Sequence, residues 1–241
     1  MQERGRGAAT SRTTCRRSFA PALAAWLALS AILGASPTRA GGGPENVLLV
    51  VNSSSLDSKT IANHYVALRQ IPPSNVMYLD WRGGREECSG PQFAAKILQP
   101  IIETIGENRL SGQVDYVVYS CDFPWKVNLK PLFPEEEFPA AFRPIASTTG
   151  ATYLWQFVRD KNPAIVMPNI NWYVPEDGGN NEQRCERIAN VSSRGFRSSF
   201  LWDRNGRRTT QRDQGQSYLL STMLGVTSGR GNTVDEILGY L

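Results

Sequence analysis

The feature that most constrains the fold is the apolar run within Asn46–Asn52, which has a polar residue at each end. A strand with one face in water alternates apolar and polar residues. This run is unbroken, as in a strand that is buried on both faces. Such strands belong mainly to parallel sheets that helices cover on both sides. The run therefore predicts an α/β protein built on a parallel sheet.

The residues after this run alternate between helical and strand patterns. A turn at Ser53–Ser55 precedes a predicted helix, which Asp57 or Ser58 is expected to cap and which Pro72 ends, because proline cannot continue the hydrogen-bond ladder. Its expected apolar side comprises Ile61, Ala62, Tyr65 and Leu68. The next predicted elements are a strand over Val76–Trp81, a helix over Pro91–Ile105 with a kink at Pro100, and a strand over Val114–Tyr119. Alternating strands and helices with short links favour a parallel sheet with helices on both faces.

The pattern changes beyond residue 121. Five prolines make residues 122–150 a long irregular segment, and such segments are often functional loops. The elements predicted after it are a helix over Gly150–Asp160, a β-hairpin of Phe196–Asp203 and Thr209–Gln214 turning at Asn205-Gly206, a fourth sheet strand over Tyr218–Leu224, and a last helix opened by the capping box Thr233–Glu236.

Residues 1–40 have the layout of a cleaved secretory signal peptide. Five arginines precede the apolar run Phe19–Ala35, and small residues lead up to Ala40. A membrane-spanning helix needs about 20 apolar residues, and this run is shorter. We therefore expect cleavage after Ala40, export to the periplasm or cell envelope or secretion, and no stable transmembrane anchor afterwards. Arg16-Arg17-Ser18-Phe19 matches a twin-arginine motif, so both that route and the general secretory route stay open.

Cleavage changes the charge of the chain. The full chain has 26 Lys and Arg against 22 Asp and Glu, but the leader holds six of the basic residues and one of the acids. The mature chain therefore carries 20 basic and 21 acidic residues, a net charge near −1. A nucleic-acid-binding surface needs a net basic face or a dense basic stripe. The local arginines around Arg207 and Arg208 are flanked by Asp203 and Asp213, so we interpret them as a solvated turn and expect no nucleic-acid partner.

Three cysteines follow the leader, namely Cys88, Cys121 and Cys185. An odd number in an oxidising compartment leaves at least one thiol unpaired or paired between chains. One disulfide among the three is compatible with the sequence, which does not fix its connectivity. No C-x-x-C spacing occurs, so the cysteines indicate neither a zinc knuckle nor a thioredoxin-type pair.

The expected organisation is a signal peptide over 1–40, a short linker over 41–45 and a single α/β domain over 46–241. The last predicted helix carries Ile237, Leu238 and Leu241, and the sequence ends there without the glycine or polar residue that normally stops a helix. This favours a domain that is truncated at its C-terminus over a short terminal helix that packs on the sheet.

Six short blocks of the chain carry a resemblance to a known family, namely Pro44–Asn52, Leu56–Ser58, Ile61–Tyr65, Arg69–Pro72, Asn75-Val76 and Tyr218–Gly225. They resemble an exported bacterial protein family of unknown function found in planctomycete-type genomes. Members usually run further, in agreement with a truncated domain. The α/β pattern is also similar, more distantly, to the caspase-like domain of gingipain-type cysteine peptidases. The fold expected from pattern and resemblance is a three-layer parallel-sheet domain, flavodoxin-like or caspase-like, incomplete, with a β-hairpin insertion.

The likeness to cysteine peptidases implies a Cys–His dyad, which the sequence does not supply. A thiol nucleophile needs a base beside it. The single histidine, His64, falls on the first predicted helix, and we interpret it as a partly exposed helix residue. Cys121 and Asp122 follow the third predicted strand and are the only catalytic candidates, although Cys121 also fits a buried thiol or a disulfide partner. With one histidine, a Ser-His-Asp triad and a multi-histidine metal site are equally disfavoured.

Two other motifs point to no ligand. Glu135–Glu137 is interpreted as a solvated acidic loop. The glycine-rich stretch Gly225–Thr233 lies between a strand and a helix but matches neither G-x-x-x-x-G-K-[ST] nor G-x-G-x-x-G, so we interpret it as a flexible turn. The sequence thus predicts no metal and no cofactor.

The topology still predicts where a pocket would form. In open parallel sheets ligands bind beyond the carboxyl ends of the strands. The pocket candidates there are Asn52, Ser53, Asp57 and Arg230. The sequence therefore predicts an exported binding or surface-associated domain without catalysis. The alternative is a peptidase-like hydrolase scaffold whose catalytic residues are missing or lie beyond Leu241.

Overall fold

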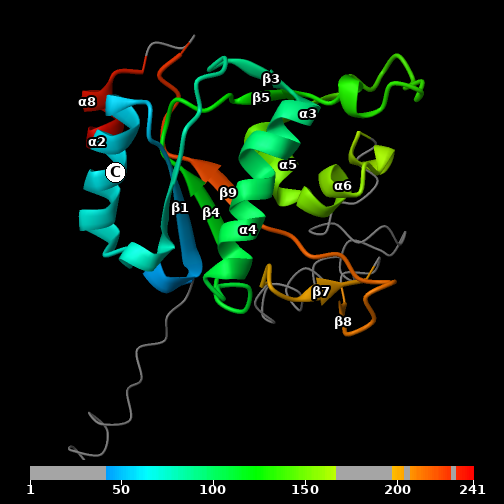
Figure 1. Ribbon diagram of the computed structural model, residues 1–241, viewed down its shortest axis with the longest axis horizontal. Helices are drawn as coiled ribbons and strands as arrows, with labels where there is room; N and C mark the ends of the chain where they lie inside the picture. Colours follow the sequence, from blue (N-terminus) through cyan, green and yellow to red (C-terminus); the bar gives the residue numbers. More distant parts are fainter. Residues whose placement is uncertain (1–41, 167–196, 204–206, 229–231) are drawn as a thin grey trace, which may run out of the picture. The chain divides into compact units, whose positions relative to one another are not determined.

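The centre of the protein is a four-stranded sheet in which all pairs are parallel, in the order β2-β1-β4-β9 (Figure 1). The structure is a computed structural model that describes residues 42–166, 197–203, 207–228 and 232–241. The predicted signal peptide, Cys185 and Arg230 lie outside these residues. The strands are β1 (Val47–Asn52), β2 (Val76–Leu79), β4 (Tyr116–Tyr119) and β9 (Leu220–Met223). The predicted α/β fold with a parallel sheet is confirmed.

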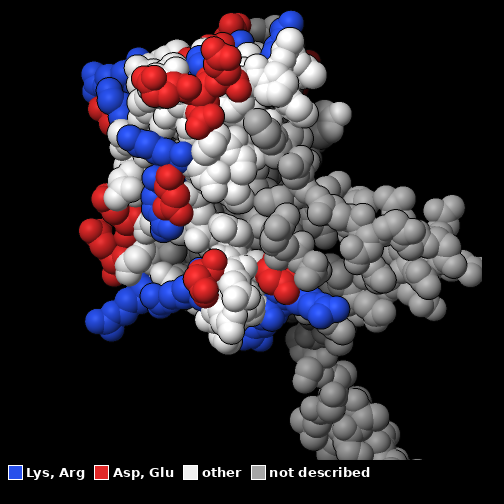
Figure 2. Space-filling view, turned by 90° about the vertical axis from the view of Figure 1, so that its right-hand side faces the viewer, with Lys and Arg blue, Asp and Glu red and all other residues white. Residues whose placement is uncertain are grey.

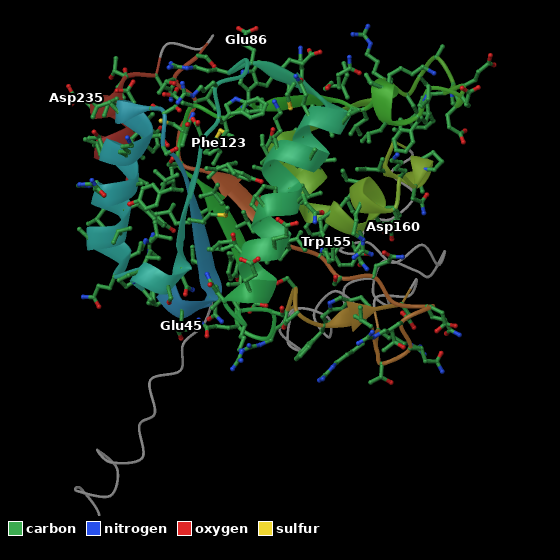
Figure 3. The ribbon with its side chains drawn as sticks, in the orientation of Figure 1. Glu45, Glu86, Phe123, Trp155, Asp160 and Asp235 are labelled. Atoms are coloured by element: carbon green, nitrogen blue, oxygen red, sulfur yellow. The ribbon has the colours of Figure 1, made fainter. Side chains whose placement is uncertain are left out.

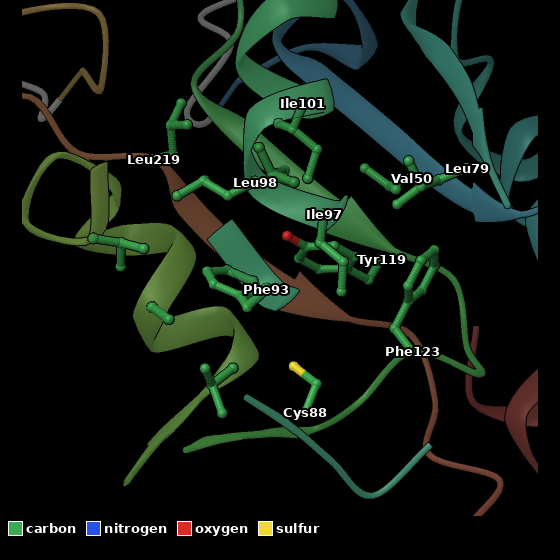
Figure 4. Close-up of a cluster of buried hydrophobic side chains, with 14 of the residues drawn as sticks. Val50, Leu79, Cys88, Phe93, Ile97, Leu98, Ile101, Tyr119, Phe123 and Leu219 are labelled. Carbon is green, nitrogen blue, oxygen red and sulfur yellow. The ribbon is translucent and has the colours of Figure 1, made fainter. Parts of the chain in front are cut away.

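Helices cover both faces of this sheet, which explains the unbroken apolar run in β1. Val47, Leu49 and Val51 face α2 (Leu56–Arg69) and pack with its Ala62. Leu48 and Val50 face the opposite way, toward the long helical segment of α3 (Gly90–Phe93), η3 (Ala94–Leu98) and α4 (Gln99–Glu107). The main core lies on this second side of the sheet. Its buried side chains include Phe93, Ile97, Tyr119 and Phe123 (Figure 4).

Further helices lie on both sides of the sheet. On the α2 side lies α8 (Val234–Tyr240), where Ile61 of α2 packs with Ile237 and Cys121. On the α4 side, α5 (Thr148–Tyr153) lies against β9, and α6 (Trp155–Arg159) follows it. The helix expected over Gly150–Asp160 therefore begins earlier and is interrupted, because Leu154 leaves helical geometry at φ −94° and ψ 34°.

The N-cap of the first helix lies two residues before the nearer of the two predicted caps. Ser55, rather than Asp57 or Ser58, has the extended backbone of an N-cap, and its hydroxyl accepts a hydrogen bond of 3.1 Å from the Ser58 N–H. The helix ends where predicted, before Pro72, with Gln70 in the left-handed region. Of the four residues expected on its apolar side, Leu68 is exposed.

The proline in the second helical segment is accommodated by a wider turn. Over Ala94–Leu98 the helix is of π type, and the Gln99 N–H donates to the Ala94 carbonyl five residues back. A proline crowds the carbonyl four residues before it and has no N–H. The π turn directly before Pro100 is one way in which a helix relieves that crowding.

The expectation of an irregular segment over 122–150 is wrong in part. It contains β5 (Lys126–Asn128) and β6 (Ile145–Ser147), which form a second sheet with β3 (Glu87–Ser89) in the order β3-β5-β6. The predicted hairpin forms as β7 (Leu201–Trp202) and β8 (Arg208–Thr209), which are shorter than expected. The remaining 3-10 turns are η1 (Pro44–Asn46), η2 (Pro73–Asn75), η4 (Lys130–Leu132) and η5 (Pro163–Ile165).

The strand order creates a switch point between β1 and β4. The connection from β1 through α2 leads to β2 along one face, and the connection from β2 through α3 and α4 leads to β4 along the other. The loops after β1 and β4 therefore diverge at the carboxyl edge of the sheet, where ligands of open α/β sheets bind. Glu86 and Asp235 lie at this end of the molecule and Glu45 at the opposite end (Figure 3).

The described helices include none with the length and apolar character that crossing a bilayer requires. On the face displayed in Figure 2, acidic and basic side chains lie next to one another, and acidic ones gather toward the upper end. This mixed pattern matches the near-neutral charge of residues 41–241, which hold 20 basic and 21 acidic residues.

Candidate functional site

An open pocket of about 580 Å³ lies beyond the carboxyl ends of three neighbouring strands. We call it the strand-end pocket. Its walls come from the loops after β1, β2 and β4, and its lining residues are Asn52, Ser53, Ser54, Ser55, Asp80, Trp81, Arg82, Gly83, Arg85 and Asp122. The pocket adjoins the switch point between β1 and β4, and most of its lining side chains are polar.

Asn52 holds the three loops together. Its amide nitrogen donates to the carbonyls of Trp81, at 3.1 Å, and Asp122, at 2.8 Å. Its amide oxygen accepts from the N–H groups of Ser54, at 3.0 Å, and Trp81, at 3.3 Å. Both amide protons and both acceptor positions are thus used, and the residue is only 3% exposed. The side chain of Asn52 builds the pocket and has no capacity left for a ligand.

The carboxylate of Asp122 is the second anchor. It accepts hydrogen bonds from the hydroxyls of Ser55 and Thr227 and forms an ion pair of 3.2 Å with Arg85. Its side chain is fully buried. Asp122 adopts φ 61°, a left-handed conformation that aspartate tolerates better than most residues, and the chain turns there immediately after β4. Loops after β1, β2, β4 and β9 therefore meet on one carboxylate.

The loop after β1 is not a phosphate cradle. The N–H groups of Ser53, Ser54 and Ser55 donate to Leu79 O, Asn52 Oδ1 and Asn52 O, at 3.0, 3.0 and 3.1 Å. Anion-binding loops instead present their backbone N–H groups to the ligand. Because all three groups are used within the protein, the loop offers no such donors.

The charged groups at the mouth of the pocket form pairs. Arg82 Nε lies 3.1 Å from Asp80 Oδ1, and the Ser54 hydroxyl also donates to Asp80. The hydrogen bond from Ser54 and the one from Arg82 lower the pKa of Asp80 below its usual value. With Arg85 paired to Asp122, the pocket holds two basic and two acidic side chains and has no net charge.

Cys121 lies beneath the pocket and is fully buried between Ile61 of α2 and Ile237 of α8. Burial, and then the nearby Asp122 and Asp57 carboxylates, raise the pKa of its thiol to about 12. A thiol of that pKa is protonated at neutral pH and is a poor nucleophile. His64 is exposed on α2, and neither cysteine nor histidine lines the strand-end pocket. Cys88 is likewise a free buried thiol.

The structure brings some of the predicted pocket residues together. Asn52, Ser53 and Asp122 line the pocket, whereas Asp57 lies in the first turn of α2 and is not part of its lining. Sequence reasoning missed Arg82 and Arg85. A signal was present, since both follow the second strand within a loop containing Gly83-Gly84, and long side chains on such a loop can reach the strand ends.

Among the described residues, no group of three or more histidine, cysteine, aspartate or glutamate side chains is arranged to hold a metal ion. Comparison of the chain with models of protein families, with curated proteins and with solved structures gave no match.

Proposed function

We propose that this chain is an exported, non-catalytic binding domain that holds an uncharged, hydroxyl-rich small molecule, such as a carbohydrate, in the strand-end pocket. The observation that carries the proposal is the electrostatic balance of a polar pocket. Its two arginines are paired with its two carboxylates, and the backbone donors of its serine loop are used internally. An anion would therefore meet no unpaired cation and no free backbone N–H group of the serine loop.

The hydrogen-bonding groups that the pocket leaves unused suit the hydroxyl groups of a ligand. Arg82 and Asp80 are exposed, and their pairing leaves further guanidinium N–H groups and carboxylate lone pairs unused. A donor and an acceptor held side by side can bind one hydroxyl group, which both accepts and donates a hydrogen bond, or two neighbouring hydroxyl groups. The hydroxyl of Ser53 and the outer side of Arg85 extend this surface across the pocket.

The peptidase-like alternative receives no such support. Within the part of the chain that the structure describes, the cysteine nearest the pocket is Cys121, whose protonated thiol is sealed by α2 and α8. We therefore place binding ahead of hydrolysis. Export rests on the leader and membership of the planctomycete-type family on the sequence blocks, and both stay predictions. An intact mass corresponding to Gly41 as first residue, measured on protein from the native cell envelope, would support export and cleavage.

Calorimetric titration tests the binding proposal. The probes are maltose, cellobiose and N,N′-diacetylchitobiose, with inorganic phosphate and glycine as charged comparisons. We expect heat with at least one saccharide, and at least tenfold weaker binding in Asp80→Ala and Arg82→Ala. The matched control Glu103→Gln, on α4 away from the pocket, leaves binding unchanged. Binding of phosphate alone, or of none of the five probes, contradicts the proposal.

A further inference from the structure

A second opening runs along the last strand of the sheet. It has a volume of about 380 Å³ and is lined by Trp125, Ser147, Thr148, Thr149, Ser221, Thr222, Met223 and Val226. We call it the edge groove. Side chains of successive strand residues point to opposite faces. A cavity that touches the three consecutive residues Ser221, Thr222 and Met223 must therefore follow the edge of β9 rather than one face of the sheet.

Two buried polar atoms in this groove have no hydrogen-bond partner, namely the indole Nε1 of Trp125 and the hydroxyl oxygen of Ser221. An unsatisfied buried donor or acceptor is costly, so native proteins leave few of them without a reason. Ser221 shares its register position with Val117 of β4, whose side chain belongs to the main core, so its hydroxyl points toward the α5 side. Trp125 and Ser221 both line the edge groove, so both unsatisfied atoms belong to residues of this one site.

The backbone of β9 adds unpaired groups at the same place. The Leu224 N–H donates to Tyr119 O at 2.8 Å, so in this parallel ladder Leu220 and Thr222 also turn their backbone groups toward β4. Ser221 and Met223 then turn theirs away from the sheet. In the described part of the chain, β9 is an end strand with no further strand on that side. Just before β9, the Leu219 N–H donates to Tyr153 O of α5 at 3.4 Å.

Nothing in the sequence of β9 protects this edge. Edge strands usually carry a lysine, a proline or a bulge that discourages pairing. Leu220–Met223 contains neither lysine nor proline, and every residue that lines the groove is uncharged. A small apolar ligand could fill the groove but would leave the repeated backbone groups of Ser221 and Met223 unpaired. An extended peptide can pair with these backbone groups and fill the groove with its side chains at the same time.

We propose that the edge groove binds an uncharged, extended peptide segment of a partner protein, which adds to β9 as a fifth strand. Backbone groups of the segment pair with those of Ser221 and Met223. One of its carbonyl oxygens accepts a hydrogen bond from the Trp125 indole N–H, and one of its apolar side chains enters the groove beside Met223 and Val226. This site is separate from the strand-end pocket and does not depend on its ligand.

The test uses the mature full chain, followed by ¹H–¹⁵N NMR. The probe is a capped pentapeptide of alternating valine and threonine. Its control is the same peptide with alternate amide nitrogens methylated, which keeps the side chains but cannot add as a strand. We expect the unmethylated peptide to move the Trp125 indole resonance downfield and to slow amide exchange of Ser221 and Met223 at least tenfold. The methylated peptide does neither.

Trp125→Phe removes the indole donor and keeps an aromatic ring, and it is expected to weaken peptide binding at least fivefold. Trp155→Phe, on α6 outside the groove, is the matched control and leaves binding unchanged. Equal binding of the methylated peptide overturns strand addition. Amides of Ser221 and Met223 that are already protected in the free protein, or a stable dimer formed through β9, overturn the partner-peptide proposal in favour of the chain itself or a second copy.

Discussion

The strand-end pocket and the edge groove belong to the same sheet but differ in whether their buried polar atoms have hydrogen-bond partners. In the pocket, Asn52 uses all its hydrogen-bonding capacity, and Asp122 has three partners. In the groove, Trp125 Nε1 and the Ser221 hydroxyl have none. Polar residues at a strand end are therefore not by themselves a sign of a ligand. What matters is which donors and acceptors the protein leaves unused, as it does on Asp80 and Arg82 at the mouth of the pocket and on Trp125 and Ser221 in the groove.

The largest expected effect separates the two regions by stability. Asp122→Ala removes a buried carboxylate, leaves Ser55, Thr227 and Arg85 without their common acceptor, and places alanine at a positive φ. We expect a loss of about 2–3 kcal/mol in the free energy of unfolding, measured by urea denaturation, because two hydroxyls lose their acceptor while the half-exposed Arg85 can be solvated. Asp80→Ala at the exposed mouth of the pocket is the control and should leave the urea midpoint unchanged. A small loss for Asp122→Ala would show that the network around it is not what holds the loops.

High pH is expected to produce the next largest effect. Burial raises the pKa of Cys88 and of Cys121 to about 12. Their ordinary value is about 8.5–9, so above that pH the unfolded chain loses thiol protons that the folded chain keeps. The stabilisation is complete below pH 9 and is lost as the pH rises toward 12. At pH 10 the loss is about 1.4 kcal/mol per thiol.

Urea denaturation between pH 8 and 10 measures this loss. Cys121→Ala should remove the contribution of the thiol beneath the strand-end pocket, and Cys88→Ala that of the thiol in the main core. If each variant retains the full pH dependence of the wild type, the two thiols are not responsible for it.

A serine-to-alanine change should have opposite signs in the two regions. Ser55→Ala removes the N-cap of α2 and one donor to Asp122. The N-cap alone contributes about 0.5–2 kcal/mol, so we expect a loss in the upper part of that range. Thermal and urea unfolding check this value. A neutral effect would mean that water replaces the hydroxyl in both roles.

Ser221→Ala is expected to change the stability least, and it gives the clearest contrast between the edge groove and the strand-end pocket. It removes a buried hydroxyl oxygen that has no partner, so the variant should be more stable by roughly 0.5–1 kcal/mol in the absence of a peptide. The same unfolding measurement made beside Ser55→Ala gives the contrast directly. A destabilised Ser221→Ala would show that the hydroxyl has a partner, such as an ordered water.

Much of the fold was predictable because its signals are local. The unbroken run in β1, the C-terminal end of the first helix and the capping box at Thr233 each depend on neighbouring residues. The structure confirms the parallel sheet that the pattern implies. The sheet β3-β5-β6 was not predictable, since its strands have three residues each and pair across long separations in the sequence. Three residues are too few to display a period of two.

The candidate sites divide in the same way. Rules on strand ends led to Asn52, Ser53 and Asp122, which line the pocket. No sequence pattern could show that Asn52 is saturated by the loops after β2 and β4, because its partners lie 29 and 70 residues away. The edge groove was beyond prediction for a similar reason, since Trp125 and Ser221 line it from positions 96 residues apart in the sequence.

Chemical-shift mapping by ¹H–¹⁵N NMR tests the central claim most directly, namely that a neutral polar ligand binds in the strand-end pocket. The titrant is the saccharide that binds most tightly in calorimetry. The account predicts that the largest shifts fall on Ser53, Ser54, Gly83 and Arg85, while the amides of Ser221 and Met223 do not move. Shifts confined to the edge groove, or no shifts at saturating saccharide, would contradict it.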